Sequence, residues 1–383
     1  MSTVPPADEL RRRLNNFRKL LRERKVPAAL ITNEKNVRYL SGFTGHDSAL
    51  LITASKKFLL TDFRYVEEAS FTAKGWPVLI EKTRRTKDGK PEVIVPAGLM
   101  GKAAYLARKL GIGKLAVEPG DMRIADQRAL QKACRGLHVK IKPEDAMVAQ
   151  LRLIKSDWEV RQIEKALRIQ EKCFGILCKE IKKGISERDA AARLRYLMVK
   201  EGADDQAFEI MFQIGSNSSL PHGRPTDRKL KGNAIILLDF GCKSGGYHSD
   251  LTRTFFLGTI PPQLRKIHGI VMEAQQAAID RIAPNVEIKS VDAAARDIIS
   301  KAGFGKAFGH STGHGLGLDI HEAPSLSWRS NGVLRPGMVV TVEPGIYLPG
   351  IGGVRIEDDV LVTASGHRVL SRLKKGLRWN GDN

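Results

Sequence analysis

The chain has 383 residues, of which 42% are hydrophobic and 27% charged, and its formal net charge is +21 at pH 7. This length accommodates two domains, and the hydrophobic content excludes a wholly disordered chain. No stretch approaches the roughly 20 apolar residues that a membrane-spanning helix needs. The first residues also lack the pattern of a signal peptide. We therefore expect a cytoplasmic protein without a membrane partner.

The first part of the chain alternates helix-like and strand-like segments. Residues 9–25 carry four apolar side chains at helical spacing, namely Leu10, Leu14, Phe17 and Leu21. Short apolar runs that are typical of buried strands follow at residues 28–32, 49–53, 57–61, 77–81 and 114–119. This alternation predicts an α/β domain over residues 1–147, followed by a second domain over residues 148–383.

The second domain contains an internal repeat. Ser156 with Glu159 forms a capping-box pattern that predicts a long helix ending near Gly184, and Ser186 begins a second helix that ends near Gly202. Residues 185–202 and 288–303 share the sequence DAAAR, and each segment follows a longer predicted helix. A pair of predicted strands comes after each segment. We therefore predict two similar units, each of two helices and a strand hairpin.

Each predicted hairpin carries two acidic residues in otherwise apolar strands. Asp239 and Asp250 lie in the first hairpin, and Glu343 and Glu357 lie in the second. A buried carboxylate is costly unless it is paired, protonated or bound to a cation. Four carboxylates that the repeat brings together would repel one another, and divalent cations between them would offset that repulsion.

Histidines accompany these acids. The glycine-rich segment 308–324 contains His310, His314 and His321, and His222 lies between two prolines in a predicted loop. Glycines allow the backbone to approach closely and leave the imidazoles accessible. An oxygen-rich site with one imidazole suits Mn(II), Co(II), Fe(II) or Zn(II) better than a thiolate site would. The sequence therefore predicts a site for divalent metal.

The positive charge and the cysteines indicate no further function. Basic residues are spread along the chain and aromatic residues make up only 6%, so no specific nucleic-acid partner is expected. The four cysteines lack CxxC spacing and the density of a disulfide scaffold. Reduced, mostly buried thiols are therefore expected at Cys134, Cys173, Cys178 and Cys242.

Five segments of the second domain resemble the motifs of the pita-bread metallopeptidases, which include methionine aminopeptidase, prolidase and Xaa-Pro aminopeptidase. They are LPHGRPTDRKL, LLDFGCKSGGYHSDLTRTF, GHSTGHGLGLDIHEAP, TVEPGIY and GGVRIEDD. In the first domain, NVRYLSGFTG and LLTDFRY resemble the creatinase-like N-terminal domain of the Xaa-Pro enzymes. The resemblance implies an α/β creatinase-like domain at residues 1–147 and an α+β pita-bread catalytic domain with a pseudo-two-fold repeat at residues 148–383. It also implies a homodimer.

By matching position, the resemblance implies two divalent ions, most commonly Mn(II), with five ligands. Asp250 and Glu357 would bridge both ions, Asp239 would bind one ion, and His314 and Glu343 would bind the other. A water shared by two such ions has a lowered pKa and supplies hydroxide near neutral pH. Glu343 would also shuttle protons.

The same resemblance implies roles for other residues around the metal site. His222 and His321 would act in catalysis and bind substrate near the scissile amide, His310 would shape the substrate pocket, and Arg355 would brace the site. Arg355 and Glu357 are expected to share one strand face, since alternate residues of a strand point the same way. An Arg in that place would keep the bridging acids ionised.

The resemblance implies a peptidase that acts on proline-containing peptides and removes the residue N-terminal to proline. A dipeptidase of the prolidase type must bind the free proline carboxylate, and in some prolidases an Arg shortly after the His-Glu pair is available for it. Here Ser325 follows that pair, which favours the aminopeptidase type and leaves the dipeptidase as the alternative.

Two other classes of function remain open at this point. A non-catalytic pita-bread protein that binds nucleic acid or protein partners would fit the charge, although such proteins usually lose metal ligands. A serine hydrolase is suggested by the GxSxG pattern at residues 309–313. That motif needs a following helix, and the further glycines Gly315 and Gly317 make a helix there improbable.

Overall fold

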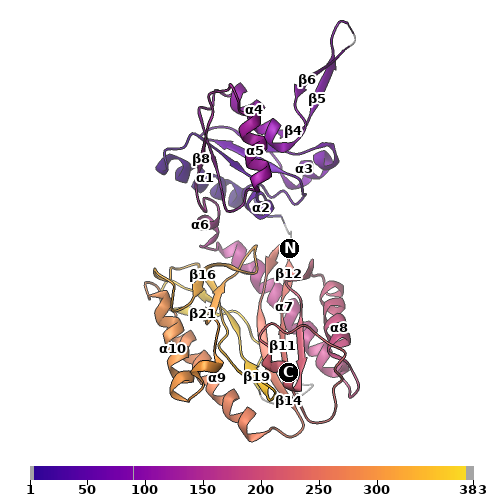
Figure 1. Ribbon diagram of the computed structural model, residues 1–383, viewed down its shortest axis with the longest axis vertical. Helices are drawn as coiled ribbons and strands as arrows, with labels where there is room; N and C mark the ends of the chain where they lie inside the picture. Colours follow the sequence, from indigo (N-terminus) through magenta and orange to yellow (C-terminus); the bar gives the residue numbers. More distant parts are fainter. Residues whose placement is uncertain (1–3, 89, 377–383) are drawn as a thin grey trace. The chain divides into compact units, whose positions relative to one another are not determined.

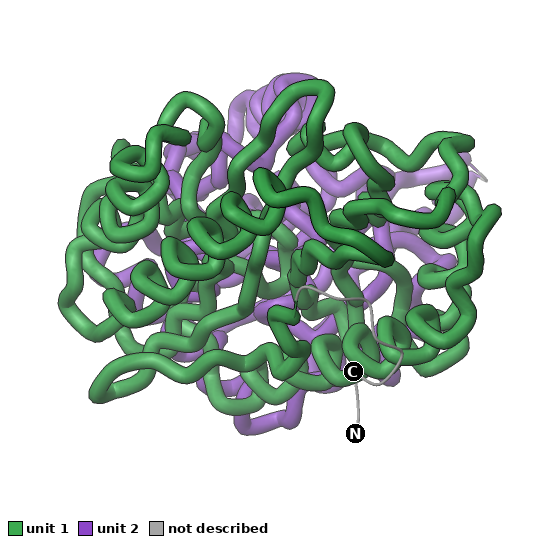
Figure 2. Tube along the Cα trace, turned by 90° about the horizontal axis from the view of Figure 1, so that it is seen from below, with its two compact units in different colours: residues 1, 153–383 green, residues 2–152 purple. Residues whose placement is uncertain are grey.

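The computed structural model of the chain describes residues 4–88 and 90–376 (Figure 1). The chain divides into two compact units, residues 2–152 and residues 153–383 (Figure 2). In the first unit, α6 (Ala149–Arg152) packs against α1 (Ala7–Glu23), and the Tyr39 hydroxyl donates to the Leu151 carbonyl at 3.3 Å. These contacts join the residues after position 147 to the first unit. The domain boundary after residue 147 stays a prediction.

The first unit is built on a mixed sheet of six strands in the order β4-β3-β2-β1-β7-β8. All five apolar runs form strands of this sheet, and a sixth strand closes its edge: β1 (Ala28–Ile31), β2 (Ala49–Thr53), β3 (Lys57–Leu60), β4 (Val78–Leu79), β7 (Lys114–Val117) and β8 (Lys140–Pro143). The predicted first helix is confirmed as α1. The other helices of the unit are α2 (Glu34–Ser41), α3 (Val66–Thr72), α4 (Leu99–Lys109) and α5 (Ile124–Ala133), with a 3-10 turn at Phe63–Tyr65. A separate hairpin, β5 (Lys82–Arg85) with β6 (Pro91–Val95), extends from the unit (Figure 1).

The second unit contains the two predicted helix pairs. They are α7 (Asp157–Glu180) with α8 (Glu187–Lys200), and α9 (Pro262–Asp280) with α10 (Ile288–Lys301). The capping box at Ser156 and Glu159 is present, and Ser186 caps α8. Helix α7 ends at Glu180, before Gly184, because Ile181 takes an extended backbone conformation. The repeated DAAAR segments lie in α8 and α10, as predicted.

The strands of the second unit lie between these helix pairs (Figure 1). One sheet has the order β10-β11-β14 and another the order β16-β15-β17-β20-β21, so each predicted hairpin contributes two paired neighbouring strands to a sheet. The strands are β10 (Met211–Ile214), β11 (Ala234–Phe240), β14 (Leu251–Leu257), β15 (Gly313–Gly315), β16 (Glu322–Leu326), β17 (Val339–Val342), β20 (Asp358–Val362) and β21 (His367–Val369). Smaller sheets are β18 (Gly345–Leu348) with β19 (Gly352–Arg355), and β9 (Asp205–Gln206), β12 (Cys242–Ser244) and β13 (Tyr247–His248). Two 3-10 turns, Gly215–Ser219 and Gly305–Ala307, complete the unit.

Two apolar clusters hold the sheets against the helices. In one, the Phe174 ring of α7 stacks on the Phe255 ring of β14 with centroids 5.1 Å apart, beside the free, buried thiols of Cys173 and Cys242. In the other, apolar residues of α9 and α10 pack on β17 and β20. Burial raises the pKa of Cys173 to about 12, so this thiol stays protonated. Among the described residues, no helix has the length and apolar character needed to cross a bilayer.

Replacing Ser156 by Ala should lower the free energy of unfolding of the second unit by about 1 kcal/mol, because an N-cap hydroxyl satisfies a helix N–H that would otherwise lack a partner. Ser156 Oγ accepts from the Glu159 N–H at 3.3 Å. Urea denaturation followed by circular dichroism measures the effect. The control variant Ser156→Thr keeps a capping hydroxyl and should unfold like the wild type; equal losses in both variants would contradict the assignment.

Candidate metal centre

The fold brings the five predicted metal ligands to one cleft of the second unit. Asp239 lies in β11, His314 lies in β15, and Glu343 directly follows β17. Asp250 directly precedes β14, and Glu357 directly precedes β20. The cleft has a volume of about 480 Å³, and all five side chains line it. Three of them, Asp250, His314 and Glu357, each offer a ligand atom within 4.8 Å of the others. The two hairpins of the repeat thus deliver their acids to the same place.

His314 connects the acids of the two hairpins. Its Nε2 lies 3.6 Å from Asp250 Oδ2 and 3.4 Å from Glu343 Oε1. Its Nδ1 lies 3.0 Å from the Gly315 carbonyl and donates to it. That contact places the ring proton on Nδ1 and leaves the Nε2 lone pair directed at the carboxylates, which is the tautomer that a metal-binding imidazole needs.

Hydroxyl groups orient the acids. Thr252 Oγ1 donates to Glu357 Oε2 at 2.7 Å, and Thr341 Oγ1 lies 3.4 Å from Glu343 Oε1. Thr252 follows Asp250 by two positions. Neither threonine was predicted from the sequence. Thr341 lies two residues before the acid that it contacts, whereas Thr252 contacts Glu357, which is far away along the chain.

Three of the buried acids have raised pKa values. Burial raises the pKa of Asp250 and of Glu357 well above the ordinary range, and the neighbouring carboxylates add to the shift. Burial also raises the pKa of Glu343 to about 8. The pKa of His314 is lowered by burial, so its imidazole is neutral. Without a cation, several of these groups would hold protons at neutral pH.

Asp239 has an oxygen that the protein does not satisfy. Its Oδ2 accepts from Arg355 Nη2 at 2.6 Å, whereas its Oδ1 is buried and has no hydrogen-bond partner among the described residues. A buried acceptor without a partner costs free energy. Together with the raised pKa values and the neutral His314, this orphaned oxygen fits a donor set for divalent metal.

The expectation for Arg355 is partly wrong. Arg355 ends β19, and Glu357 lies in the two-residue link before β20, so the two residues do not share a regular strand. Arg355 contacts Asp239 directly, and the pKa of Asp250 and of Glu357 stays raised. Burial is the largest cause of both shifts, and at Glu357 it outweighs the lowering effect of the guanidinium.

All four predicted histidines line the cleft: His222, His310, His314 and His321. The His321 ring packs edge-on against His314 with centroids 4.5 Å apart. His310 Nε2 lies 2.9 Å from the Tyr347 hydroxyl, which also accepts from Arg355 Nη1 at 2.7 Å. Burial lowers the pKa of His310 to about 4, with Arg355 adding to the shift. Sequence reasoning missed Tyr347, although it lies in the motif TVEPGIY.

The rest of the cleft combines an apolar wall with one ion pair. Four apolar side chains contribute to the lining: Phe208, Met211, Pro221 and Ile320. Arg224 Nε lies 3.1 Å from Glu209 Oε2, and both side chains are exposed at the lining. Ser311 also lines the cleft, but strand β15 follows it where a nucleophile elbow requires a helix. The serine-hydrolase interpretation is therefore wrong.

Comparison with known proteins agrees with this geometry. Residues 161–364 match the model of metallopeptidase family M24, and residues 13–154 match that of the creatinase/prolidase N-terminal domain. An Xaa-Pro dipeptidase from Pyrococcus horikoshii is 32% identical over 97% of this chain and 99% of its own length. Of the solved structures, an Xaa-Pro dipeptidase from Bacillus anthracis is 38% identical with a TM-score of 0.88, covering 96% of this chain and 99% of that one. An X-Pro aminopeptidase from Thermotoga maritima is 33% identical with a TM-score of 0.84, covering 95% and 99%.

The chain belongs to metallopeptidase family M24. It combines a creatinase-type N-terminal domain with a pita-bread C-terminal domain, as its sequence motifs implied. It is therefore an enzyme, a metal-dependent hydrolase of peptide bonds. The interpretation as a non-catalytic binding protein of the same fold is set aside.

Chelator-treated protein should lose thermal stability as the pH rises from about 5 to about 8. Folding raises the pKa values of Asp250, Glu357 and Glu343, the last to about 8. Folding therefore favours the protonated forms. That stabilisation is complete below the unfolded-state pKa values of about 4 and is lost as the pH rises through the folded values.

Excess Mn(II) should flatten this pH dependence, because the cation replaces the protons on the carboxylates. Thermal denaturation across this pH range, with chelator or with Mn(II), measures both curves. Two curves of equal slope would contradict the placement of these carboxyls at a metal centre.

Proposed function

We propose that this chain is a dinuclear metallopeptidase that hydrolyses the Xaa-Pro bond at the N-terminus of peptides. The observation that carries the proposal is the convergence of four carboxylates and one neutral imidazole in a cleft with an apolar wall. The distances around His314 Nε2, 3.4 and 3.6 Å to acids of the two hairpins, support a shared site.

Asp239, Asp250, His314, Glu343 and Glu357 would hold the two ions. The oxygen-rich donor set favours Mn(II), with Co(II), Zn(II) or Fe(II) as alternatives. When bound, such ions lower the pKa of a water and polarise the scissile carbonyl. Asp250 and Glu357 are the proposed bridging residues, as the family resemblance implies, and their ligand atoms lie within 4.8 Å of one another and of that of His314.

The remaining polar residues of the cleft would bind and orient the peptide. His222 and His321 line the cleft without being proposed ligands, so their imidazoles can hydrogen-bond the scissile amide and supply a proton to the leaving proline nitrogen. Proline nitrogen is a poor leaving group until it is protonated. Glu343 lines the same cleft, so its carboxylate is placed to accept a proton and pass it on.

The Tyr347 hydroxyl and Arg355 would hold Asp239 and His310 in position. Arg355 holds Asp239 Oδ2 and the Tyr347 hydroxyl, and that hydroxyl lies against His310 Nε2. This chain of contacts fixes His310, which stays neutral because its pKa is lowered to about 4. His310 would thus present an uncharged ring to the substrate, as a pocket for an uncharged side chain requires.

The proline preference rests on the apolar wall and on the relatives. Phe208, Met211 and Ile320 offer apolar surface to a pyrrolidine ring. The related proteins from B. anthracis, P. horikoshii and T. maritima are all named for Xaa-Pro bonds. Ser325, which follows the His-Glu pair in β16, supports the aminopeptidase type over the dipeptidase.

An Xaa-Pro dipeptidase is the second candidate. Two of the three relatives carry that name. Arg224 at the cleft is a cation that can bind the free carboxylate of a dipeptide, although in this structure it pairs with Glu209 at 3.1 Å.

We also propose a homodimer, as the family resemblance implies, and light scattering of the purified chain tests it.

The Mn(II)-loaded protein should cleave both Ala-Pro and Ala-Pro-Ala, and excess chelator should abolish both activities. Amino acid release measured by chromatography gives both rates. Cleavage of Ala-Pro alone would establish the dipeptidase alternative. A metal-loaded protein that cleaves neither peptide refutes the proposed Xaa-Pro activity.

Asp250→Asn should lower kcat/KM by about 100-fold or more and weaken metal binding, since an amide cannot replace a bridging carboxylate. Asp227→Asn is the control because Asp227 is exposed and pairs with Arg188 outside the cleft. Rates and bound metal per chain should be measured for both variants. Full activity in Asp250→Asn would overturn the proposed bridge.

A further inference from the structure

The segment of residues 371–375, called the C-terminal strap here, is held by many polar contacts although it has no regular secondary structure. The backbone N–H groups of Arg372 and Leu373 donate to the Glu171 carboxylate of α7, the latter at 3.1 Å. The carbonyls of Leu373 and Lys374 each accept from Arg253 Nε at 3.2 Å. These contacts use the strap backbone, so they fix the path of the segment.

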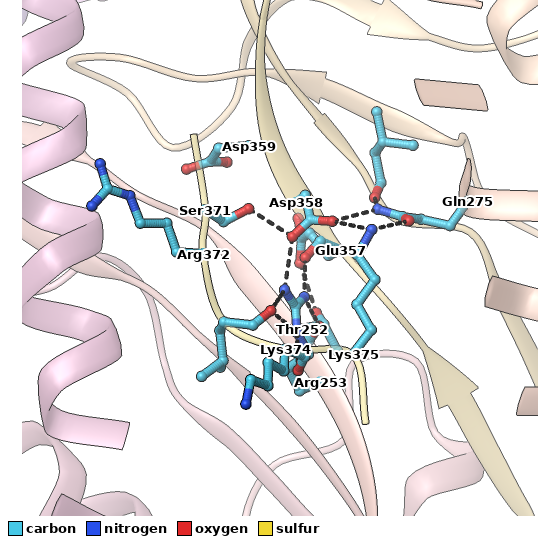
Figure 3. Close-up of polar contacts among 12 residues, drawn as sticks. Thr252, Arg253, Gln275, Glu357, Asp358, Asp359, Ser371, Arg372, Lys374 and Lys375 are labelled. Carbon is cyan, nitrogen blue, oxygen red and sulfur yellow. Dashed lines mark hydrogen bonds and ion pairs between the residues drawn. The ribbon is translucent and has the colours of Figure 1, made fainter. Parts of the chain in front are cut away.

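Arg253 joins the strap to the backbone of a proposed metal ligand. Its side chain is 1% exposed and lies between the strap and the link that carries Glu357 (Figure 3). Nη1 donates to the Glu357 carbonyl and, at 3.0 Å, to the Thr252 carbonyl. Nη2 donates to the Leu373 carbonyl at 2.6 Å and to Asp358 Oδ1 at 2.7 Å. One guanidinium thus binds both segments.

Asp358 is the second junction, and the strap supplies two of its partners. Its carboxylate accepts from Ser371 Oγ at 2.6 Å and from Lys375 Nζ at 2.7 Å. Gln275 Nε2 donates to it at 2.8 Å, and Lys375 in turn donates to Gln275 Oε1 at 2.7 Å (Figure 3). Asp358 is 1% exposed, and a buried carboxylate depends on such charge-assisted contacts.

The backbone between β19 and β20 connects the contacts of Asp358 to the cleft. Glu357 lines the cleft and accepts from the Thr252 hydroxyl, whereas Asp358, the next residue, contacts the strap. Successive residues of an extended chain point to opposite sides. A displacement of Asp358 would therefore rotate the peptide that carries Glu357 and move its carboxylate.

We infer that the C-terminal strap is a positioning element of the metal centre: Lys375 and Ser371 hold Asp358 and thereby fix the Glu357 carboxylate in the cleft. The inference rests on the proposed role of Glu357 as a metal ligand. None of the strap residues lines the cleft, so they act as positioning residues. Outer residues that orient a ligand commonly affect metal affinity by about 10- to 100-fold.

Two adjacent lysines of the strap offer a matched test. Lys375 reaches the buried carboxylate of Asp358, whereas the side chain of Lys374 is exposed and only its carbonyl takes part in the contacts. Lys375→Met and Lys374→Met remove the same charge at neighbouring positions. Lys375→Arg keeps a donor and a charge, and Ser371→Ala removes a single hydroxyl.

Mn(II) binding to the full-length chain should be measured by electron paramagnetic resonance and by chelator competition, without reference to peptidase activity. Lys375→Met should raise the Kd of at least one Mn(II) by about 10-fold and change the spectrum of the bound pair. Lys374→Met should bind Mn(II) like the wild type, and Lys375→Arg should recover most of the affinity. A purely structural role would shift the melting temperature in chelator without this selective loss of metal.

The outcomes separate the inference from the proposed function. A wild-type chain that binds no Mn(II) overturns the proposed metal site and the inference with it. A wild-type chain that binds Mn(II), with unchanged affinity and spectrum in Lys375→Met and Ser371→Ala, overturns the inference alone. If Lys375→Met does not fold, Ser371→Ala decides, with a several-fold weaker Kd expected.

Discussion

The repulsion among carboxylates buried in one cleft is the constraint on which the second unit depends. Asp250 and Glu357 are 5% and 1% exposed. Burial raises the pKa of each, and neighbouring carboxylates add to the shift because little water screens their charges. Cations or protons in the cleft offset this repulsion. The same charge that destabilises the metal-free site provides the affinity for divalent ions.

Each half of the repeat contributes two acids to the cleft. Helix pairs α7/α8 and α9/α10 cover the strands from both sides (Figure 1). The acids of both hairpins line the same cleft. His314 belongs to neither hairpin. It reaches the acids of both with a single ring nitrogen, because its other nitrogen is held by the Gly315 carbonyl.

Several contacts that hold the proposed metal ligands come from the short stretch between Arg355 and Asp359. Arg355 holds Asp239, Glu357 enters the cleft, and Asp358 contacts Arg253 and the strap. The Asp359 carboxylate accepts from the Asp250 N–H at 3.2 Å. Neighbouring residues thus alternate between the cleft and the structure behind it. A small shift of this stretch would disturb several ligands at once.

The sequence by itself determined the elements, the repeat and the chemical character of the site. Apolar runs bounded by polar residues indicated the strands of the first unit, and the capping box located the start of α7. These signals are local, because they depend on spacing along the chain. The acid pairs were visible for the same reason: a carboxylate within an apolar strand is conspicuous without any knowledge of its partner.

Only the tertiary structure decided which groups meet. It paired Arg355 with Asp239, placed Tyr347 between Arg355 and His310, and brought the strap onto Asp358. It also interrupted the strand after Arg355, where the sequence suggested continuity. These outcomes depend on contacts between residues far apart in the chain and on the desolvation of buried charges. Neither quantity is encoded in local spacing, so both became definite only with the packing of the sheets.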